Sequence, residues 1–270
     1  MKELTIRTIS ALVLAIVMLS AVLISPWTYA ALLLFVVLVG TYEMARLMKM
    51  DDIPNLLIGE SFSIVSFALA ALVALQITPV KWLLLELLLF MIPFLFALFS
   101  KTKDSKTVLT CLYASLFYLC LPSSMMLFMY RVDLFGILAG SRIIILIFCV
   151  LWSNDVFAYL TGKLLGKHKL FPRISPGKTV EGSLGGLLFA VIGMFVFAHF
   201  ADWLPHLAAI GIAFISVVFG TLGDLCESML KRQAGVKDSG KLIPGHGGIL
   251  DRFDSVMFSV PFIFVYLLLL

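Results

Sequence analysis

Long runs of apolar residues, separated by short polar segments, make up most of the chain. Each run is roughly 20 residues long, the length at which an α-helix crosses the hydrocarbon core of a bilayer. Helices are expected because a backbone in lipid has no water to bond with, and the alternating pattern of a transmembrane β-barrel is absent. The runs predict an all-α polytopic membrane protein with about nine transmembrane helices, at residues 8–25, 27–47, 56–77, 80–99, 107–129, 141–161, 183–201, 205–226 and 255–270.

The composition agrees with this pattern. Of the 270 residues, 61% are hydrophobic and only 13% are charged, and the mean hydropathy is +1.09. These values exclude a soluble globular protein. We therefore expect the lipid bilayer to surround the chain, and we expect no nucleic-acid partner.

The basic residues are distributed unevenly between the two sides of the predicted helices. If the N-terminus is cytosolic, only Lys81, Arg131 and Arg142 of the 20 lysines and arginines fall on the outer side. Positive charge collects on the cytosolic side of membrane proteins. The bias predicts a cytosolic N-terminus and a C-terminus on the opposite side.

Two cytosolic connections are longer and more polar than the others, at residues 162–182 and 231–254. Both are basic and contain several glycines, and chemistry is often carried by loops on a rigid scaffold. We expect residues 1–130 to form a scaffold of N-terminal helices. Residues 131–270 would then form the catalytic region, with its site at the cytosolic interface.

The eighth predicted helix ends in GTLGDLCESMLKR. Its Asp224, Glu227, Ser228 and Lys231 are spaced to share one helical face near the membrane surface. Carboxylates at this depth are unfavourable unless they are paired or liganded. A plain salt bridge between Glu227 and Lys231 is one explanation.

Two more acids, Asp251 and Asp254, precede the last apolar run and lie three residues apart. Capping of the helix N-terminus explains aspartate here, and for Asp254 alone it is sufficient. It does not explain Asp224 and Glu227 at the neighbouring helix end, or Asp238 between them. Five converging carboxylates would repel one another without a cation, so the pattern favours a divalent metal, with Mg²⁺ the best match for oxygen ligands and substrate phosphates.

The loop between these helices, KRQAGVKDSGKLIPGHGG, combines positive charge with glycines. Glycine lets the backbone come close to a ligand and present its N–H groups to an anion. The combination favours phosphate. His246, between glycines, is interpreted either as a phosphate donor or general acid–base group, or as a surface histidine that packs the turn.

In the earlier loop, Lys163, Lys167 and Lys169 are explained by the positive-inside rule alone. The segment SPGKT differs, because Ser175, Lys178 and Thr179 place a turn, a cation and hydroxyls directly before the seventh helix.

Thr179 and Ser183 are candidate N-caps of that helix. Asp155, in the cytosolic half of the sixth helix, is a functional candidate because an uncompensated acid there is unfavourable. Glu43, Glu60 and Glu86 lie apart from any such cluster. Glu43 can pair with Arg46 one turn later, and all three are interpreted as structural or left without a role.

The 27 residues from Ser228, SMLKRQAGVKDSGKLIPGHGGILDRFD, resemble the signature of phosphatidate cytidylyltransferases, also called CDP-diacylglycerol synthases. The run AYLTGKLLGKHKLFPRISPGKTVEG is similar to a second region of that family, with Lys163 where arginine is more often expected. The direct resemblance covers residues 152–255.

The resemblance implies an enzyme of the bacterial inner membrane that joins CTP and phosphatidic acid, with a divalent metal. We assign the metal to Asp224, Asp251 and Asp254, with Glu227 and Asp238 as weaker candidates. The phosphates are assigned to Lys231, Arg232, Lys237, Arg252, His246, Gly247 and Gly248; the substrate-binding wall is assigned to Asp155, Ser175, Lys178 and Thr179. Within this set, Asp224, Asp251, Asp254, Lys231 and His246 are the expected catalytic residues, and Asp238 is also a candidate for substrate binding.

The number of cations stays open, so a second ion is compatible with the sequence. The resemblance also implies a homodimer, for which no interface residue stands out. Two other functions are compatible with the helices: a transporter, although its polar groups would gather near the midplane, and a CTP-dependent lipid kinase. A CDP-alcohol phosphotransferase is disfavoured because its motif is absent.

Overall fold

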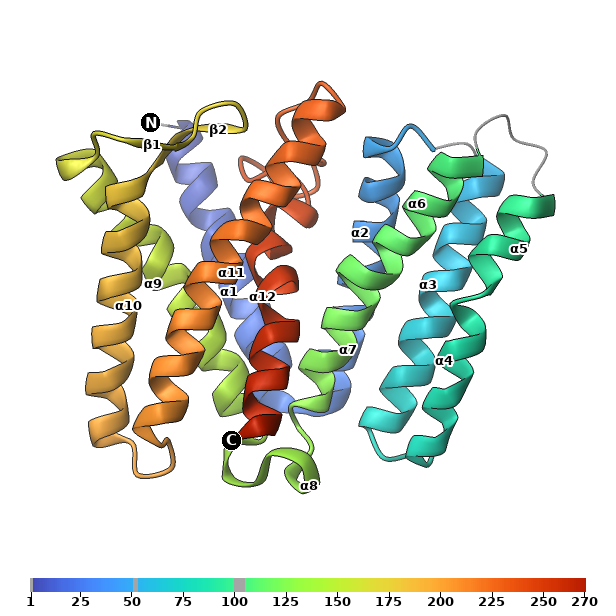
Figure 1. Ribbon diagram of the computed structural model, residues 1–270, viewed down its shortest axis with the longest axis horizontal. Coiled ribbons are helices and arrows are strands. Elements are labelled where there is room, and N and C mark those ends of the chain that lie inside the picture. The colour runs from blue at the N-terminus through green and yellow to red at the C-terminus, as the bar shows by residue number, and fades with distance from the viewer. Residues whose placement is uncertain (1, 51–52, 100–104) are drawn as a thin grey trace. The chain divides into compact units, whose positions relative to one another are not determined.

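The computed structural model describes residues 2–50, 53–99 and 105–270 (Figure 1). Within these ranges, nine helical segments are long and apolar enough to cross a membrane. The predicted spans are confirmed, and Lys101 and Lys103 of the predicted cytosolic charge lie outside the described residues. The segments before residue 129 are α1 (Lys2–Ile24), α2 (Pro26–Leu47), α3 (Ile53–Ala74), η1 (Val80–Leu83), α4 (Leu84–Leu89), α5 (Ile92–Phe99), α6 (Ser105–Ser115), η2 (Leu116–Cys120) and α7 (Leu121–Phe128).

Prolines account for the breaks within two of the membrane-spanning segments, Val80–Phe99 and Ser105–Phe128. Proline has no N–H to continue the helical ladder. Pro93 lies at the start of α5, just after the break from α4, and Pro122 follows the π-helical turn η2.

The later elements are α8 (Val132–Phe135), η3 (Gly136–Leu138), α9 (Ser141–Leu165), β1 (Lys169–Phe171), β2 (Ser175–Thr179), α10 (Val180–Phe200), α11 (His206–Gln233) and α12 (Leu250–Leu269). The chain forms two compact units. The first contains residues 1–128 and 234–252, and the second contains residues 129–233 and 253–270.

In the first unit, α2 lies at the centre and packs against α1, α3, α6 and α7. Leu33, Val36 and Val37 of α2 are completely buried. Gly40 allows α2 to pack closely against η2, because a side chain at this position would collide with Leu119 of η2. This packing fixes the position of Glu43, one turn further along α2.

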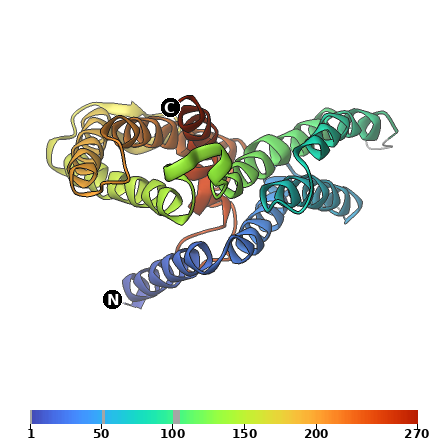
Figure 2. The same ribbon diagram turned by 90° about the horizontal axis from the view of Figure 1, so that it is seen from below.

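In the second unit, α10 packs against both α9 and α11, and Figure 2 shows these helices almost end-on. Gly182 and Gly186 face α9 one turn apart. A Cβ at Gly182 would lie 2.7 Å from the carbonyl oxygen of Ala158, and one at Gly186 would lie 3.1 Å from the Cβ of Ala158. Small residues let membrane helices approach closely, so these glycines set the spacing of α9 and α10.

The connection 162–182, predicted as a loop, is ordered by a hairpin. Helix α9 continues to Leu165, and β1 then pairs antiparallel with β2. The hydroxyl of Thr179 accepts a hydrogen bond from the N–H of Gly182, at 3.1 Å, so Thr179 is confirmed as the N-cap of α10. Ser183 does not cap the helix; it donates to the carbonyl of Thr179. The hairpin therefore joins the ends of α9 and α10.

The connection 231–254 is shorter than predicted at both ends. Helix α11 continues to Gln233 and α12 begins at Leu250. Lys231 and Arg232 are thus helical, and Asp254 lies one turn inside α12. The expectation that Asp254 could serve merely as an N-cap is wrong for this reason.

We expect Gly186→Leu to destabilise the protein by about 1–3 kcal/mol, because a large side chain would push α10 away from α9. The melting temperature in detergent should fall. Gly193→Leu, on the same helix, is the control, because a Cβ there meets no described atom within 4 Å. Equal melting temperatures for the two variants would contradict this account of the packing.

Candidate active site

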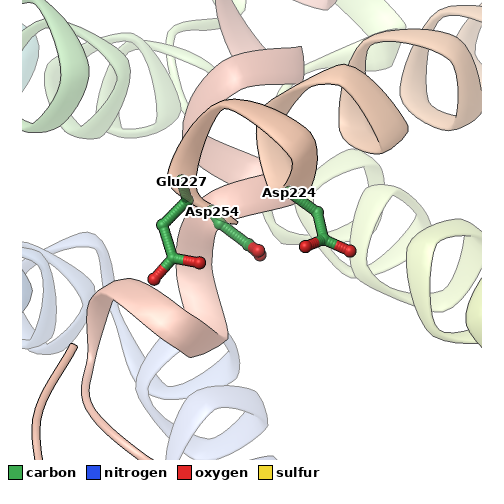
Figure 3. A group of neighbouring side chains, drawn as sticks. All are labelled: Asp224, Glu227 and Asp254. Atoms are coloured by element: carbon green, nitrogen blue, oxygen red, sulfur yellow. The ribbon is translucent and has the colours of Figure 1, made fainter. Parts of the chain in front are cut away.

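Three carboxylates meet where α11 packs beside α12 in the second unit. One ligand oxygen from each of Asp224, Glu227 and Asp254 lies within 4.8 Å of the others. Figure 3 shows Asp254 of α12 between the two acids of α11. Glu227 is completely buried. The structure thus brings together three of the predicted metal ligands.

Glycines of α11 allow the three carboxylates to lie close together. A Cβ at Gly223 would lie 2.6 Å from the carbonyl oxygen of Asp254, and one at Gly220 would lie 3.4 Å from the Cβ of Ser255. The two helices can therefore approach closely at the level of the acids. The segment GTLGD combines this close contact with the first carboxylate of the cluster.

Two lysines compensate part of the negative charge. Lys231 pairs with Glu227 at 2.5 Å, which is the salt bridge expected from the helical spacing, and Lys178 of β2 pairs with Asp224. Three acids and two lysines leave a formal charge of −1 in this group. Ser228 also donates to Asp224, at 3.2 Å.

The donor set fits a metal ion. All three groups are carboxylates, whose oxygens suit hard cations. Acids this close together repel one another unless positive charge is supplied, and the two lysines supply only part of it. The cluster can therefore accept a cation.

A cavity of about 490 Å³ opens between α9, the hairpin and α10. The four residues predicted to form the substrate-binding wall all line it: Asp155, Ser175, Lys178 and Thr179. Lys178 also pairs with Asp224. The same lysine therefore connects the cavity to the carboxylate cluster.

Some cavity residues were missed from the sequence. Lys163 and Lys169 line the cavity but were explained as ordinary cytosolic charge. The spacing of Asp155, Tyr159 and Lys163, four residues apart, could have placed them on one face of α9. Asn154 also lines the cavity; its Oδ1 is buried and has no hydrogen-bond partner among the described residues.

Residues 234–252, the greater part of the signature segment, belong to the first unit. A tight turn is closed by a hydrogen bond of 2.9 Å from the N–H of Ile243 to the carbonyl of Gly247. Gly245 and Gly247 have φ values of +74° and +82°, which glycine adopts without strain. The predicted turn around His246 is therefore present.

Asp251 organises this segment. Its Oδ2 accepts three hydrogen bonds, from the N–H and the hydroxyl of Ser239 and from the N–H of Gly248, at 2.8, 2.9 and 2.8 Å. The Gly248 amide, which we expected to contact phosphate, is thus used within the loop. Asp251 is not one of the three acids in the cluster, and its role as a metal ligand stays a prediction.

His246 is half-buried in this turn. Its Nδ1 is buried without a hydrogen-bond partner among the described residues. Burial, followed by the positive charges of Arg252 and Arg7, lowers the pKa of the imidazole. The neutral ring can therefore donate to or accept from a ligand.

The remaining predicted phosphate ligands lie on the surface. Arg232, Lys237 and Arg252 are exposed, as is Asp238. The Nε of Arg232 donates to the carbonyl of Ile174, at 3.5 Å, which links α11 to the hairpin. The contacts of these side chains with phosphate stay predictions.

Comparison with known proteins identifies the family of this chain. The model of the cytidylyltransferase family matches residues 5–270. The chain belongs to this family. A relative named phosphatidate cytidylyltransferase, from Staphylococcus haemolyticus (strain JCSC1435), is 36% identical over 97% of this chain and 98% of its own length. The family assignment makes the protein a nucleotidyltransferase, and the nine apolar helical segments of its described residues are those of an integral membrane protein.

Shorter matches within the family are closer in sequence. Phosphatidate cytidylyltransferases of Staphylococcus aureus (strain COL) and Staphylococcus epidermidis (strain ATCC 12228 / FDA PCI 1200) are 48% and 49% identical, each over 48% of this chain and 50% of the relative.

We expect Mg²⁺ or Mn²⁺ to raise the melting temperature of the wild-type protein, because a ligand that binds only the folded state stabilises it by about 2.7 kcal/mol at 100 times its Kd. Asp254→Asn removes one ligand and should abolish most of this shift. Glu60→Gln changes an acid of α3 outside the cluster and should retain it. An unchanged shift in Asp254→Asn would exclude the cluster as the cation site.

Proposed function

We propose that the protein is a phosphatidate cytidylyltransferase. It would transfer CMP from CTP to phosphatidic acid and release pyrophosphate, which yields CDP-diacylglycerol for phospholipid biosynthesis. The names of the relatives support this substrate pair. The observation that carries the proposal is Lys178, which lines the cavity and pairs with an acid of the carboxylate cluster.

The chemistry needs positioning more than base catalysis. A phosphate oxygen of the lipid forms a bond to the α-phosphorus of CTP, while the bond from that phosphorus to the β-phosphate oxygen breaks. The lipid phosphate is already anionic, so no strong base is required. The barrier arises from bringing two anions together and from charge on the leaving pyrophosphate.

The basic cavity can offset this repulsion. Lys163, Lys169 and Lys178 all line it, and a lysine is a compact positive charge for phosphate. Lys178 lies where it can pair with Asp224 or turn to a phosphate in the cavity. Thr179 and Ser175 add hydroxyl groups to the same wall.

We propose that Asp224, Glu227 and Asp254 hold Mg²⁺. When bound, this ion neutralises phosphate charge and stabilises the leaving oxygen. Lys231 holds Glu227 in place through their ion pair. The proposal also includes metal binding by Asp251 and a second cation. It further includes contacts with phosphate from His246, Gly247, Arg232, Lys237 and Arg252.

We further propose that the site faces the cytosol from the bacterial inner membrane. There the acyl chains of the lipid stay in the bilayer while the headgroup meets a water-soluble nucleotide. The distribution of lysine and arginine supports this orientation. Residues 1–130 would act mainly as scaffold, and a homodimer is expected from the family resemblance.

The reaction can be tested with two labels. Purified protein is incubated with phosphatidic acid, Mg²⁺ and CTP that is radiolabelled at the α- or the γ-phosphate. We expect the α-label in the lipid and the γ-label in pyrophosphate. A γ-label in the lipid would identify a lipid kinase instead, and substrate uptake into vesicles without reaction would favour a transporter.

Lys178→Met should lower kcat by about 100-fold or more, because it removes a charge aimed at the reacting phosphates. Lys167→Met is the matched control: it removes an exposed lysine from the same connection and should leave kcat nearly unchanged. Similar kcat values for both variants would refute the role of Lys178.

A further inference from the structure

Glu43 of α2 is almost completely buried, with 3% of its surface exposed. The sequence suggested a pair with Arg46. Among the described ion pairs none joins these residues, and the guanidinium of Arg46 lies instead over the ring of Tyr42, 5.8 Å from its centre. The carboxylate of Glu43 is directed to a different partner.

That partner is the signature segment. Oε1 of Glu43 accepts a hydrogen bond from the N–H of Ile249 at 3.0 Å, and Oε2 accepts one from the N–H of Leu250 at 2.9 Å. These amides lie at the start of α12, where N–H groups have no partner within the helix. A negative charge is favourable at this end of a helix. Glu43 therefore caps α12 from a helix that lies some 200 residues earlier in the chain.

Ser239 joins this cap to Asp251. Its hydroxyl lies 2.8 Å from Oε2 of Glu43 and 2.9 Å from Oδ2 of Asp251. Asp251 in turn accepts from the Gly248 amide. The network thus fixes both ends of the stretch 239–250, which contains the turn with His246.

The glycines of the segment fit around the same carboxylate. A Cβ at Gly240 or at Gly248 would collide with Glu43. These two glycines are therefore required by the close approach of the acid. Their backbone freedom alone would not explain them.

We propose that Glu43 is a positioning residue for the reaction. Its carboxylate holds residues 239–250 in the conformation that presents His246 and the start of α12 to the substrates. The effect of Glu43 on turnover rests on the proposed function, whereas its effect on the conformation of residues 239–250 does not. A helix of the first unit would thereby order the segment of the same unit that carries His246.

The experiment compares Glu43→Gln with Glu86→Gln. Gln replaces one acceptor oxygen with an N–H₂ group that faces the loop amides. Glu86 is the matched control because it also accepts a serine hydroxyl within the first unit, from Ser66 at 3.0 Å, but does not belong to this network. Two readouts are used: kcat with CTP and phosphatidic acid, and the rate of trypsin cleavage after the exposed Lys237 and Lys241.

We expect Glu43→Gln to lower kcat about tenfold or more and to speed cleavage by a similar factor, since a hydrogen bond to a charged group is lost. Its melting temperature should match that of Glu86→Gln. Ser239→Ala, a milder change, should act in the same direction, and its effect should not add fully to that of Glu43→Gln.

Faster cleavage with an unchanged kcat would make Glu43 a structural anchor only and overturn the proposal. Unchanged cleavage and kcat in both Glu43→Gln and Ser239→Ala would overturn it as well. If the wild-type protein forms no CDP-lipid, the proposed function fails, but the cleavage rates still report whether Glu43 holds the loop.

Discussion

Compensation of negative charge in apolar surroundings is the constraint on which the structure depends. A carboxylate within a membrane helix is stable only where donors or cations surround it. Each central acid meets this condition differently: Glu227 has Lys231, Asp224 has Lys178, and Glu43 has the amides at the start of α12. Where the partner lies on another element, as for Asp224 and Glu43, the interaction also helps to determine how the two elements pack.

Small residues make such compensation geometrically feasible. A side chain reaches its partner only if the backbones approach closely, and glycine removes the intervening Cβ atoms. Gly223 does so between α11 and α12, Gly182 does so between α10 and α9, and Gly248 leaves room for Glu43. The carboxylates of this chain therefore reach partners on other elements where glycines let the backbones approach.

The helices could be predicted from the sequence because a bilayer imposes a minimum apolar length on each one. The acids of α11 could also be predicted, since helical spacing puts Asp224 and Glu227 on one face. The role of Glu43 could not, because its partners lie about 200 residues away and local spacing suggested Arg46. The place of Lys163 in the cavity was not predicted for a related reason: a charge that obeys the positive-inside rule gives no local sign that it also lines a cavity.

The first unit can be completed only late in the synthesis of the chain. Residues 234–252 belong to the first unit, although that unit is otherwise complete by residue 128. The amides that Glu43 binds are supplied only when the start of the last helix has been synthesised. Contacts between residues so distant in sequence form late, because closing a long loop is entropically unfavourable. A chain that ends before residue 249 would therefore carry most of the helices but lack the amides that hold the carboxylate of Glu43.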